Sequence, residues 1–287
     1  MENLKGVIIS GASTGIGRGI ALALAQRGYW AFAGVRRAQD AEALQAAAGT
    51  ELSGRLTPVM LDVTDTASVQ AARDQVEAAL GGTELVGLVN NAAIAVSGPL
   101  EFLPLEALRK QLEVNVVGAL AMVQEFAPLL RRSRGRVINV SSVGGFVSTA
   151  FQGPYCASKF ALEALSDSLR RELQPWGIQV CLIQPGSTAT PMWAKGTAAA
   201  RETLADLPDA ALQLYSDMAQ RALQNAERTA ERAVPVEVVV DKVYAALRAK
   251  RPRTRYRAGL DTQIMRVVSW LLPDRALDWF LRTATGV

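Results

Sequence analysis

Short apolar runs alternate with longer alanine-rich stretches along the first two thirds of the chain. Each apolar run is continuous, which is typical of strands covered on both faces of a parallel sheet. The runs cover residues 5–10, 29–35, 56–63, 85–90, 136–141 and 178–185. The stretches between them favour helices and cover residues 15–28, 38–48, 66–80, 104–131 and 153–173. The pattern predicts an α/β fold, a doubly wound parallel sheet flanked by helices.

The pattern changes after Pro185. Residues 190–235 are alanine-rich and predict a helical lid beside the carboxyl ends of the strands, where sheets of this kind bind ligands. Residues 254–257 predict a last strand, and residues 258–287 predict a broken amphipathic helical extension. The sequence contains no internal repeat or low-complexity linker. We therefore expect a single domain over residues 1–287.

The first apolar run ends in the glycine-rich segment GASTGIG, residues 11–17. Glycines permit a tight turn, close approach of the backbone to a pyrophosphate and close packing of helix on strand. The following helix points its first amide groups at the anion. An ordinary turn is the alternative, but the position between the first strand and the first helix favours a dinucleotide loop. The residues expected to bind the cofactor here are Gly11, Ser13, Thr14, Gly15, Ile16 and Gly17.

The end of the second predicted strand bears on the choice of cofactor. A carboxylate there would bind a ribose 2′-hydroxyl and select NAD. Val35 occupies that position, and Arg36 and Arg37 follow it. A guanidinium can hold a 2′-phosphate through paired bonds, so we expect NADP(H) to be preferred over NAD(H). The alternatives are solvated surface arginines here and, for Asp62 after the third strand, a helix cap instead of an adenine contact.

Seven motifs occur in a fixed order along the chain: SGASTGIG (10–17), LDV (61–63), NNAA (90–93), NVVG (115–118), SSVGG (141–145), YCASK (155–159) and QPGSTAT (184–190). Together they resemble the short-chain dehydrogenase/reductase family, densely over residues 5–195 and loosely beyond. Residues 98–108 and 153–173 resemble its retinol and 17β-hydroxysteroid dehydrogenase group. The resemblance implies a Rossmann-type fold and an enzyme that interconverts an alcohol and its carbonyl with a nicotinamide cofactor.

The catalytic residues implied by the resemblance are Asn115, Ser142, Tyr155 and Lys159. Tyr155 and Lys159 are four positions apart, on one face of a helix. A free phenol has a pKa of about 10, and we expect the neighbouring ammonium to lower it, so that Tyr155 can act as general acid and base. Ser142 would hold the substrate oxygen, and Asn115 would hold a water for proton relay. The alternatives are a surface Tyr-Lys pair, a capping serine and a solvated asparagine.

The resemblance implies further cofactor contacts. Lys159 and Tyr155 would lie against the nicotinamide ribose, and the segment after the sixth strand would hold the carboxamide. The remaining expected contacts are Asp62, Val63, Asn91, Ala92, Pro185, Gly186, Thr188 and Thr190. Thr190 is equally suited to cap a helix before Pro191. The family commonly has glycine where Ala93 stands, and a side chain would crowd the cofactor if that position required a positive φ.

The substrate is expected to be apolar. Met192 and Trp193 open the predicted lid, and the layout of the family would bring Val143, Phe151 and Gln152 from the other side. These side chains suit a steroid, a retinoid or another apolar ketone or aldehyde. Core packing of Met192 and Trp193 is the alternative.

Composition and charge exclude several classes. The chain has no histidine, which excludes a Ser-His-Asp triad and a histidine-ligated metal, and we expect no metal. A net charge of +4 is too small to indicate a nucleic-acid binder. The two cysteines have no framework spacing and indicate a reducing compartment. No apolar run is long enough for a secretory signal or a membrane span, so we expect a cytoplasmic protein.

Two features of the C-terminal region, a basic stretch and a group of aromatic residues, leave other functions open. The stretch 248–257 has six basic residues, and Trp270, Trp279 and Phe280 lie beyond it. For the basic stretch, a solvated surface is favoured over contact with a membrane or an anionic substrate. The aromatic cluster is either an interfacial anchor or buried at a subunit contact. A homodimer or homotetramer is expected through the helix that bears Tyr155 and the helix before it. The rival functions are a non-catalytic NADP(H) sensor, a membrane-surface interaction protein and, less favoured, a sugar epimerase or dehydratase.

Overall fold

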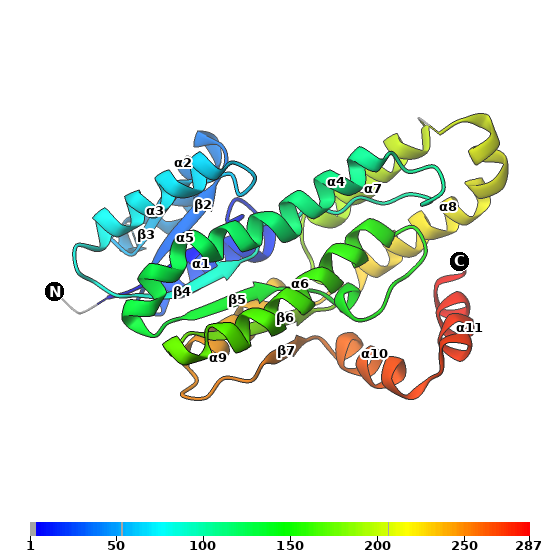
Figure 1. Ribbon diagram of the computed structural model, residues 1–287. Helices are drawn as coiled ribbons and strands as arrows, with labels where there is room; N and C mark the ends of the chain where they lie inside the picture. The colour runs from blue at the N-terminus through cyan, green and yellow to red at the C-terminus, as the bar shows by residue number, and fades with distance from the viewer. Residues whose placement is uncertain (1–3, 53, 206) are drawn as a thin grey trace.

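A computed structural model places seven parallel strands in one sheet (Figure 1). It describes residues 4–52, 54–205 and 207–287; residues 1–3 of the expected domain and residue 206 of the expected lid lie outside the described residues. The spatial order is β3-β2-β1-β4-β5-β6-β7. The strands are β1 (Lys5–Ile9), β2 (Tyr29–Val35), β3 (Leu56–Met60), β4 (Leu85–Asn90), β5 (Arg136–Val140), β6 (Gln179–Pro185) and β7 (Arg255–Ala258).

Helices connect the strands and continue beyond them. They are α1 (Gly15–Gln26), α2 (Ala38–Leu52), α3 (Thr66–Leu80), α4 (Leu105–Leu112), α5 (Gly118–Ser133), α6 (Gly153–Glu172), α7 (Met192–Ala205), α8 (Asp209–Glu231), α9 (Val236–Arg248), α10 (Leu260–Leu271) and α11 (Asp274–Thr285). The doubly wound α/β fold predicted from the apolar pattern is confirmed.

The sheet is covered on both faces, which is why the strands at its centre are largely apolar. On one face, a core cluster joins the strands to α1, α2 and α9. On the other, a second cluster joins them to α3 and α5, with α6 packed beside it. Ile9 and Ile8, neighbours on β1, belong to the two different clusters. This alternation follows from the two-residue period of a strand.

The strand order reverses between β1 and β4, and this arrangement creates the binding edge. All six strand pairings are parallel, so the carboxyl ends of the strands lie along one edge. The glycine-rich segment follows β1, the NNAA motif begins at the end of β4, and the SSVGG motif follows β5. Segments that lie far apart in sequence therefore converge there.

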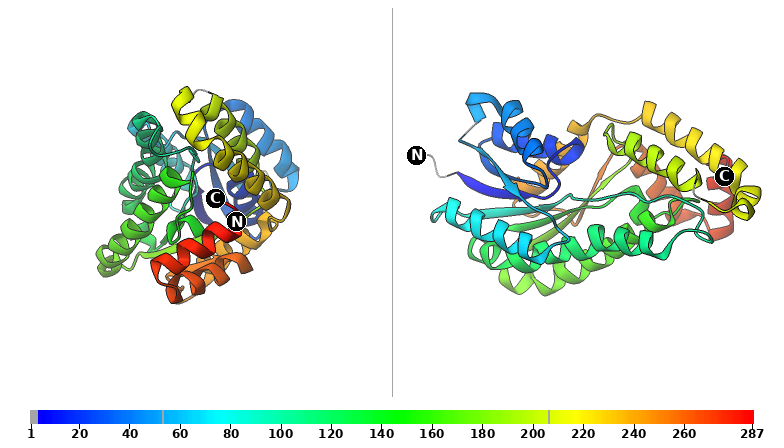
Figure 2. Two further views of the ribbon diagram at one scale, coloured as in Figure 1. Left: turned by 90° about the vertical axis from the view of Figure 1, so that its right-hand side faces the viewer. Right: turned by 90° about the horizontal axis from the view of Figure 1, so that it is seen from above.

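Beyond this edge lie α7, α8, α10 and α11 (Figure 2). The predicted helical region folds as two helices, with α7 packed against α8, and α11 also contacts α8. The predicted last strand is confirmed as β7, which pairs with β6 from Leu182↔Arg255 onward. The predicted broken helix is confirmed too, since Pro273 separates α10 from α11.

The predicted helix over residues 104–131 runs from Leu105 to Ser133 and contains an unpredicted π-helical turn, Glu113–Val117, between α4 and α5. By length and composition this helix could cross a membrane. In the fold, however, it packs on the sheet, and Met122, Phe126 and Leu130 are fully buried.

Candidate active site

Ser142 and Tyr155 meet at the carboxyl end of β5. Ser142 caps the 3-10 turn Val143–Gly145, where its oxygen accepts a bond from the Gly144 amide at 3.1 Å. Tyr155 lies in the first turn of α6, and its phenol is close enough to the Ser142 side chain for that hydroxyl to act on its pKa. The fold thus brings the Tyr155 phenol and the Ser142 hydroxyl together, although they are thirteen residues apart in the sequence.

Lys159 lies one helical turn after Tyr155 and is buried. Its Nζ donates to the Val140 carbonyl oxygen at 2.8 Å and is 5.7 Å from the centre of the Tyr155 ring. Burial lowers the pKa of Lys159 to about 8, while the Glu163 carboxylate acts in the opposite direction. A lysine with this pKa is partly neutral near physiological pH, and this makes it responsive to charges bound beside it.

The expectation that Lys159 lowers the pKa of Tyr155 is wrong for the residues of the protein alone. Burial raises the pKa of Tyr155 above its ordinary value, and the hydrogen bond from Ser142 only partly opposes this. The physical reason is that desolvation of a phenolate costs more than one hydroxyl recovers. Since the ammonium is bonded to Val140, it lies beside the ring instead of binding the phenol oxygen.

Asn115 occupies the π-helical turn and is fully enclosed. Its Oδ1 accepts from the Ile94 amide at 2.9 Å, and its Nδ2 donates to the Ile94 carbonyl at 3.1 Å and to Ser158 Oγ at 3.0 Å. Ser158 Oγ in turn donates to the Tyr155 carbonyl at 2.7 Å. Asn115 therefore connects to α6 through Ser158, and it is not a solvated residue.

Several buried polar residues support this arrangement and were not predicted. Gln111 binds the Ile94 carbonyl and the Val96 amide, and so holds the segment after β4 beside Asn115. Asn90 and Asn139, paired across β4 and β5, are bonded to each other at 2.9 Å, and Asn139 donates to Ser166 of α6. The asparagines at the ends of predicted buried strands were the available signal, because buried polar groups need partners.

The glycine-rich segment has the geometry of a dinucleotide loop. Gly11 and Gly15 have φ values of 66° and 54°, which favour glycine. A side chain on Gly17 would collide with the Gly11 carbonyl oxygen, so helix α1 begins closer to β1 than any other residue would allow. Ser13, Thr14 and Ile16 complete the turn, with Thr14 as the N-cap of α1. A pyrophosphate fits this cradle.

The two arginines after β2 differ in their surroundings. Arg37 forms two 2.8 Å bonds with the Asp40 carboxylate, which holds the pKa of Asp40 below its ordinary value. Arg36 is exposed and lies near Asp62 and Asp40, whose pKa values its charge also lowers. Among the described residues, Arg36 forms no ion pair and could bind a 2′-phosphate, whereas the guanidinium of Arg37 is already bonded to Asp40.

Asp62 and Val63 follow β3. Asp65, not Asp62, is the N-cap of α3, so the capping alternative for Asp62 is wrong. Burial raises the pKa of Asp62, but bonds from the Thr64 amide and hydroxyl at 3.0 and 2.7 Å outweigh it and leave the pKa lowered. Val63 is buried against Gly118 at the start of α5.

Asn91 and Ala92 connect β4 to the glycine-rich segment. The Asn91 amide group donates to the Ser10 and Gly11 carbonyls at 3.1 and 3.0 Å. Ser10 Oγ accepts from the backbone amides of Asn91 and Ala92. The backbone of Ala93 does not have a positive φ, so this position does not require the glycine that is common in the family.

The segment after β6 is held by a residue that sequence reasoning missed, Asp261. Its carboxylate accepts from the Ser187 amide at 2.8 Å and from the Thr262 amide at 2.8 Å. A side chain on Gly186 would collide with this carboxylate. Gly186 itself donates to the Ala258 carbonyl at 3.0 Å. The first turn of α10 thus fixes the main chain immediately after Pro185.

The rest of that segment is tied to the region before α9 and to the glycine-rich segment. Thr188 is buried and forms a parallel bridge with Val234. Thr190 and Pro191 approach within 3.2 and 3.6 Å of where a side chain on Gly15 would lie. Because Thr190 lies over the glycine turn, the expected cofactor residues after β6 and β1 are neighbours.

The expected substrate residues fall into two groups. Val143 follows Ser142 directly, and Phe151, with a φ of 63°, packs its ring edge to face with Tyr215 of α8 at 6.2 Å. Gln152 is bonded to Ser97 Oγ at 2.9 Å. These residues join the segments after β4 and β5 to the helices of the predicted lid.

Met192 is exposed at the start of α7, whereas Trp193 is directed back toward its own segment. Its indole nitrogen donates to the Thr188 carbonyl at 2.9 Å, and its ring lines a hollow with Glu227 and Ala230 of α8. The structure therefore brings Trp193 beside Thr188 and α8.

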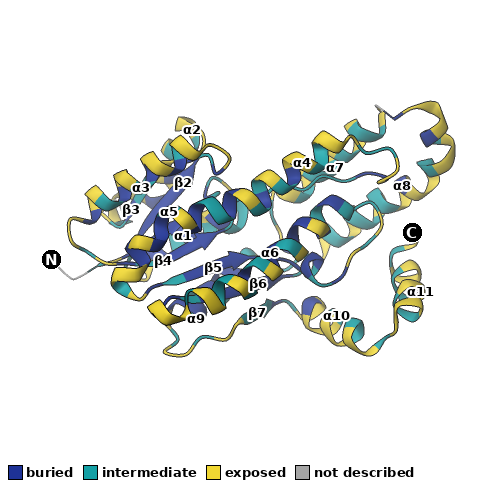
Figure 3. Cartoon of the chain, in the orientation of Figure 1, coloured by how far each residue is buried: buried dark blue, intermediate teal, exposed yellow. Residues whose placement is uncertain are grey.

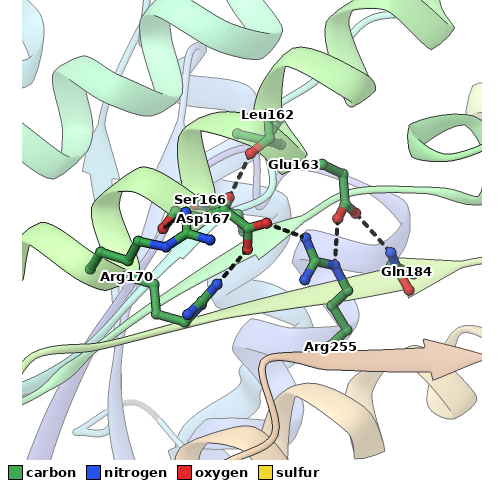
Figure 4. A network of polar contacts seen from close by, with 9 residues as sticks. Leu162, Glu163, Ser166, Asp167, Arg170, Gln184 and Arg255 are labelled. Carbon is green, nitrogen blue, oxygen red and sulfur yellow. Dashed lines mark hydrogen bonds and ion pairs between the residues drawn. The ribbon is translucent and has the colours of Figure 1, made fainter. Parts of the chain in front are cut away.

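The basic stretch after α9 is partly structural. Arg255 on β7 binds Glu163 at 2.8 Å and Asp167 at 3.1 Å, both on α6, and Glu163 also accepts from Gln184 (Figure 4). The prediction of a solvated surface is thus wrong for Arg255. This network links α6 to β6 and β7, one turn beyond Lys159.

Comparison with known proteins agrees with this geometry. The family model described as short chain dehydrogenase matches residues 5–201. The chain is 37% identical to retinol dehydrogenase 5 of Mus musculus over 284 residues, 95% of this chain and 86% of that protein. It is 32% identical to the NADPH-dependent 3-dehydrocapnine reductase of Ornithobacterium rhinotracheale, over 96% of this chain and 95% of that protein.

Solved structures show the same architecture. A short-chain dehydrogenase from Streptomyces avermitilis matches with a TM-score of 0.76 and 26% identity, over 94% of this chain and 93% of that one. One from Burkholderia cenocepacia in complex with NADP has a TM-score of 0.72, 26% identity and coverage of 98% and 99%. One from Burkholderia phymatum in complex with NAD has the same TM-score, 24% identity and coverage of 93% and 92%, and shows the fold alone. The match over residues 5–201 is consistent with the glycine cradle and with the proximity of Ser142 to Tyr155. The chain therefore belongs to the short-chain dehydrogenase family of oxidoreductases.

Proposed function

We propose that this oxidoreductase interconverts an apolar alcohol and its carbonyl with NADP(H), and that Tyr155 is the general acid and base. The single observation that carries the proposal is the grouping of Ser142, Tyr155 and buried Lys159 at the carboxyl edge of the sheet, with the Lys159 ammonium 5.7 Å from the centre of the Tyr155 ring. A sensor of NADP(H) would need the glycine cradle, but it would not need this pair of hydroxyl groups.

The bound nicotinamide would supply or accept the hydride. Tyr155 gives its phenol proton to the carbonyl oxygen in reduction, or takes it from the alcohol in oxidation. Ser142 donates to the same oxygen and orients it. Since burial raises the pKa of Tyr155, the neutral phenol predominates at neutral pH, and this form suits the reduction of a carbonyl.

Lys159 and Asn115 support Tyr155 in different ways, Lys159 by its charge and Asn115 by positioning. The Lys159 ammonium, held by Val140, would bind the nicotinamide ribose and contribute positive charge when a phenolate forms. Both amide hydrogens of Asn115 are used, for Ile94 and Ser158. We therefore assign Asn115 a positioning role through Ser158 and the π-helical turn, and any relay water would be bound by other groups.

A preference for NADP(H) is supported by the difference between Arg36 and Arg37. Arg36 is exposed after β2 and free of a close carboxylate among the described residues, while Arg37 is bonded to Asp40. One relative is named as NADPH-dependent, and one solved relative contains NADP. Another neighbour contains NAD, so the fold by itself does not select the cofactor.

An apolar substrate is supported by the residues around the hydroxyl pair and by the names of the relatives. Val143 and the aromatic group of Phe102, Phe151 and Tyr215 lie on segments that surround this edge. A retinol dehydrogenase and a 3-dehydrocapnine reductase are among the relatives. We propose a steroid, a retinoid or another long apolar carbonyl as the substrate.

We further propose that the chain acts as one domain, in which residues 190–235 form the lid, and that it associates as a dimer or tetramer through α5 and α6. Exposed Phe160 on α6 and Val117 before α5 support this contact. Both cysteines are free and buried, which supports a cytoplasmic location.

The proposed function is tested by titrating the purified protein with NADPH and NADH, followed by a panel of apolar ketones and aldehydes read at the nicotinamide absorbance. We expect tighter binding of NADPH and turnover on apolar carbonyls. Arg36→Ala should reduce the preference for NADPH by roughly tenfold or more, while Arg37→Ala, as the matched control, should change it little. Binding of NADPH without turnover across the panel would favour the sensor.

A further inference from the structure

Glu163 is a carboxylate buried inside the protein, and the chemistry proposed above does not use it. It lies on α6, four residues after Lys159 and eight after Tyr155, so the three side chains are arranged along one side of the helix. Only 8% of Glu163 is exposed. Because burial of an ionised carboxylate is costly without charged or donor groups around it, its surroundings indicate what it does.

Two groups from neighbouring strands hold the Glu163 carboxylate in place (Figure 4). Its Oε1 accepts from Gln184 Nε2 of β6 at 2.9 Å, and its Oε2 accepts from Arg255 Nε of β7 at 2.8 Å. Arg255 also binds Asp167, one turn further along α6, at 3.1 Å. Paired with a guanidinium, the Glu163 carboxylate carries a negative charge at neutral pH and is fixed at one position.

The stem of Glu163 packs against the turn that bears Ser142. A side chain on Gly145 would lie 3.0 Å from Glu163 Cγ, 3.3 Å from Glu163 Oε1 and 2.6 Å from Ser141 Oγ. The backbone at Gly145 therefore approaches Glu163 more closely than a larger residue would allow. Gly145 ends the 3-10 turn Val143–Gly145, whose first amide groups Ser142 caps. Glu163 thus supports the segment that places the Ser142 hydroxyl.

Glu163 is also the charged group that acts on Lys159. The Lys159 ammonium is buried and bonded to the Val140 carbonyl, and burial lowers its pKa to about 8. The Glu163 carboxylate opposes this and raises the pKa, and it is the one charged group among the described residues that shifts it. A negative charge next to a buried ammonium favours the protonated form.

Other acidic groups near α6 do not provide this negative charge. On α4 and the π-helical turn, Glu106 and Glu113 are exposed. On α6 itself, Asp167 is bonded to Arg170 and Arg255.

The remaining charged groups on the elements packed against α6 are cations. They are Arg109 and Lys110 of α4, Arg255 and Arg257 of β7, and Arg266 of α10. The titratable groups beside them are the Tyr155 phenol and the thiols of Cys156 and Cys181. Glu163 is therefore the carboxylate available to balance Lys159.

We propose that Glu163 is a positioning residue of this active site. Its carboxylate, fixed by Gln184 and Arg255, is the countercharge of the buried Lys159 ammonium, and its stem supports the turn that places Ser142. The role rests on the proposed function, in which the ammonium offsets the charge of a phenolate at Tyr155. Since Arg255 belongs to β7, the last strand of the sheet contributes to the support of the site.

The test compares the wild type with Glu163→Gln and Asp167→Asn. Glu163→Gln removes the charge and keeps the size of the side chain. Asp167→Asn is the matched control, because it also removes one carboxylate from Arg255 on the same helix, although Asp167 does not act on Lys159. The chain contains six lysines, so carbon-13 labelling of lysine Cε gives few NMR signals. The signal that disappears in Lys159→Met identifies Lys159.

We expect the Lys159 signal of the wild type to titrate with a midpoint near pH 8. In Glu163→Gln the midpoint should fall by roughly one pH unit, because the carboxylate no longer stabilises the ammonium. In Asp167→Asn it should stay at the wild-type value. An unchanged midpoint in Glu163→Gln would overturn the proposal, and so would an equal fall in the control. The measurement requires no substrate, so it is independent of the proposed function.

The pH profile of kcat for an apolar ketone is the second readout. The limb at high pH should move to lower pH in Glu163→Gln, by the same amount as the NMR midpoint, and should stay in place in Asp167→Asn. A purely structural role would lower kcat equally at every pH, and that result would overturn the assignment. Failure of the proposed function would instead appear as absence of turnover in the wild type, with the NMR shift intact.

A second variant keeps the test available if Glu163→Gln does not fold. The double variant Glu163→Gln with Arg255→Gln leaves no unpaired guanidinium at this place. Its Lys159 midpoint should also fall below that of the wild type, whereas a midpoint at the wild-type value would overturn the proposal.

Discussion

Helices α6 and α10 break the usual rule of burial in opposite directions. Four polar side chains of α6 are buried: Ser158, Lys159, Glu163 and Ser166. Helix α10 buries only Thr262 among its residues and exposes the leucine, isoleucine and valine that would normally face a core. Figure 3 shows buried residues along α6 and mostly exposed or intermediate residues along α10. The two departures differ in whether the described chain supplies a partner for them.

Helix α6 tolerates its polar interior because each group has a partner. Lys159 donates to Val140, Ser166 donates to the Leu162 carbonyl at 2.6 Å, and Glu163 accepts from Gln184 and Arg255. An unpartnered polar group in the same place would cost several kcal/mol by typical transfer values, roughly 1–3 per group. The partners come from β5, β6 and β7, so the helix is held at one position and one rotation.

Helix α10 gains nothing within the described chain from its exposed apolar stripe, which comprises Leu260, Ile264, Val267 and Leu271. Its position depends on Asp261, Thr262 and Arg266, which make polar or cation–ring contacts. Burial of each large aliphatic side chain is worth about 1.5–3 kcal/mol, and α10 forgoes this for several residues. The comparison teaches that the buried polar groups of α6 find their partners inside the protein, while the exposed apolar residues of α10 have no such partner within the described chain.

The largest effect is expected at Tyr155. Tyr155→Phe removes the phenol oxygen and keeps the ring, so it should lower turnover by roughly 10²–10⁴-fold, the usual contribution of general acid catalysis. NADPH titration and the thermal midpoint should stay close to those of the wild type. Retained turnover would show that the polar interior of α6 serves stability alone.

The next effect is on stability and depends on pH. Lys159 has a pKa of about 8 in the folded protein, below the value of an unfolded chain. Between pH 8 and about pH 10.4, Lys159 binds more protons in the unfolded chain than in the folded protein. Its contribution to the free energy of unfolding therefore increases as the pH rises through this window and decreases as the pH falls. Against Lys159→Met, the wild type should gain roughly 3 kcal/mol of unfolding free energy across this window.

Urea unfolding of both proteins at several pH values measures this difference. Other titrating groups, including Cys181 with a pKa raised by burial to about 11, are present in both proteins and cancel. A difference that does not change between pH 8 and pH 10.4 would mean that Lys159 is not buried as a titrating group.

A smaller effect is expected where α10 meets the site. Asp261→Ala removes the acceptor for the Ser187 amide and should weaken NADPH binding by roughly tenfold, the typical value of one charge-assisted bond. Affinity for 2′,5′-ADP, which lacks the nicotinamide half, should be unchanged. Asp274→Ala, at an exposed carboxylate on α11, is the control. Equal loss for both ligands would indicate general damage to the fold.

The smallest effect is expected at the exposed apolar residues of α10. Trp270→Glu should change the unfolding free energy by less than about 0.5 kcal/mol, because the side chain is solvent-exposed. The matching change on α6, Leu162→Glu, buries an unpaired carboxylate and should cost several times more, roughly 3 kcal/mol or above. Thermal melts of the two variants compare the helices directly. Similar losses would show that α10 is packed in solution.

Much of the fold was readable from local patterns. Continuous apolar runs located the first six strands, because a strand buried on both faces has few polar positions to confuse the pattern. The seventh strand, Arg255–Ala258, is not such a run and was predicted separately over residues 254–257. Strand ends were less accurate: β3 stops at Met60, although the apolar run continues to Val63. The π-helical turn at Asn115 had no local signal, since it depends on bonds to Ile94 and Ser158.

The candidate site divides in the same way. The glycine spacing and the Tyr155–Lys159 spacing are set by short-range geometry, so sequence sufficed to predict a phosphate cradle and a shared helix face. The raised pKa of Tyr155 and the lowered pKa of Lys159 could not be predicted from the sequence, because both shifts come mainly from burial by segments that are distant in the sequence. Asp261 lies 74 residues from Ser187, and no spacing rule connects them.

The sequence by itself determined the alternation of strands and helices, the glycine cradle and the residues that can exchange a proton, because each is a property of neighbouring residues along one element. Only the tertiary structure decided that Arg37 is engaged by Asp40, that Arg255 is neutralised by α6, that Asp261 holds the main chain after β6, and that the apolar stripe of α10 lies in solvent. The physical reason is that partnership and burial are relations between surfaces, and they exist only after the chain has brought those surfaces together.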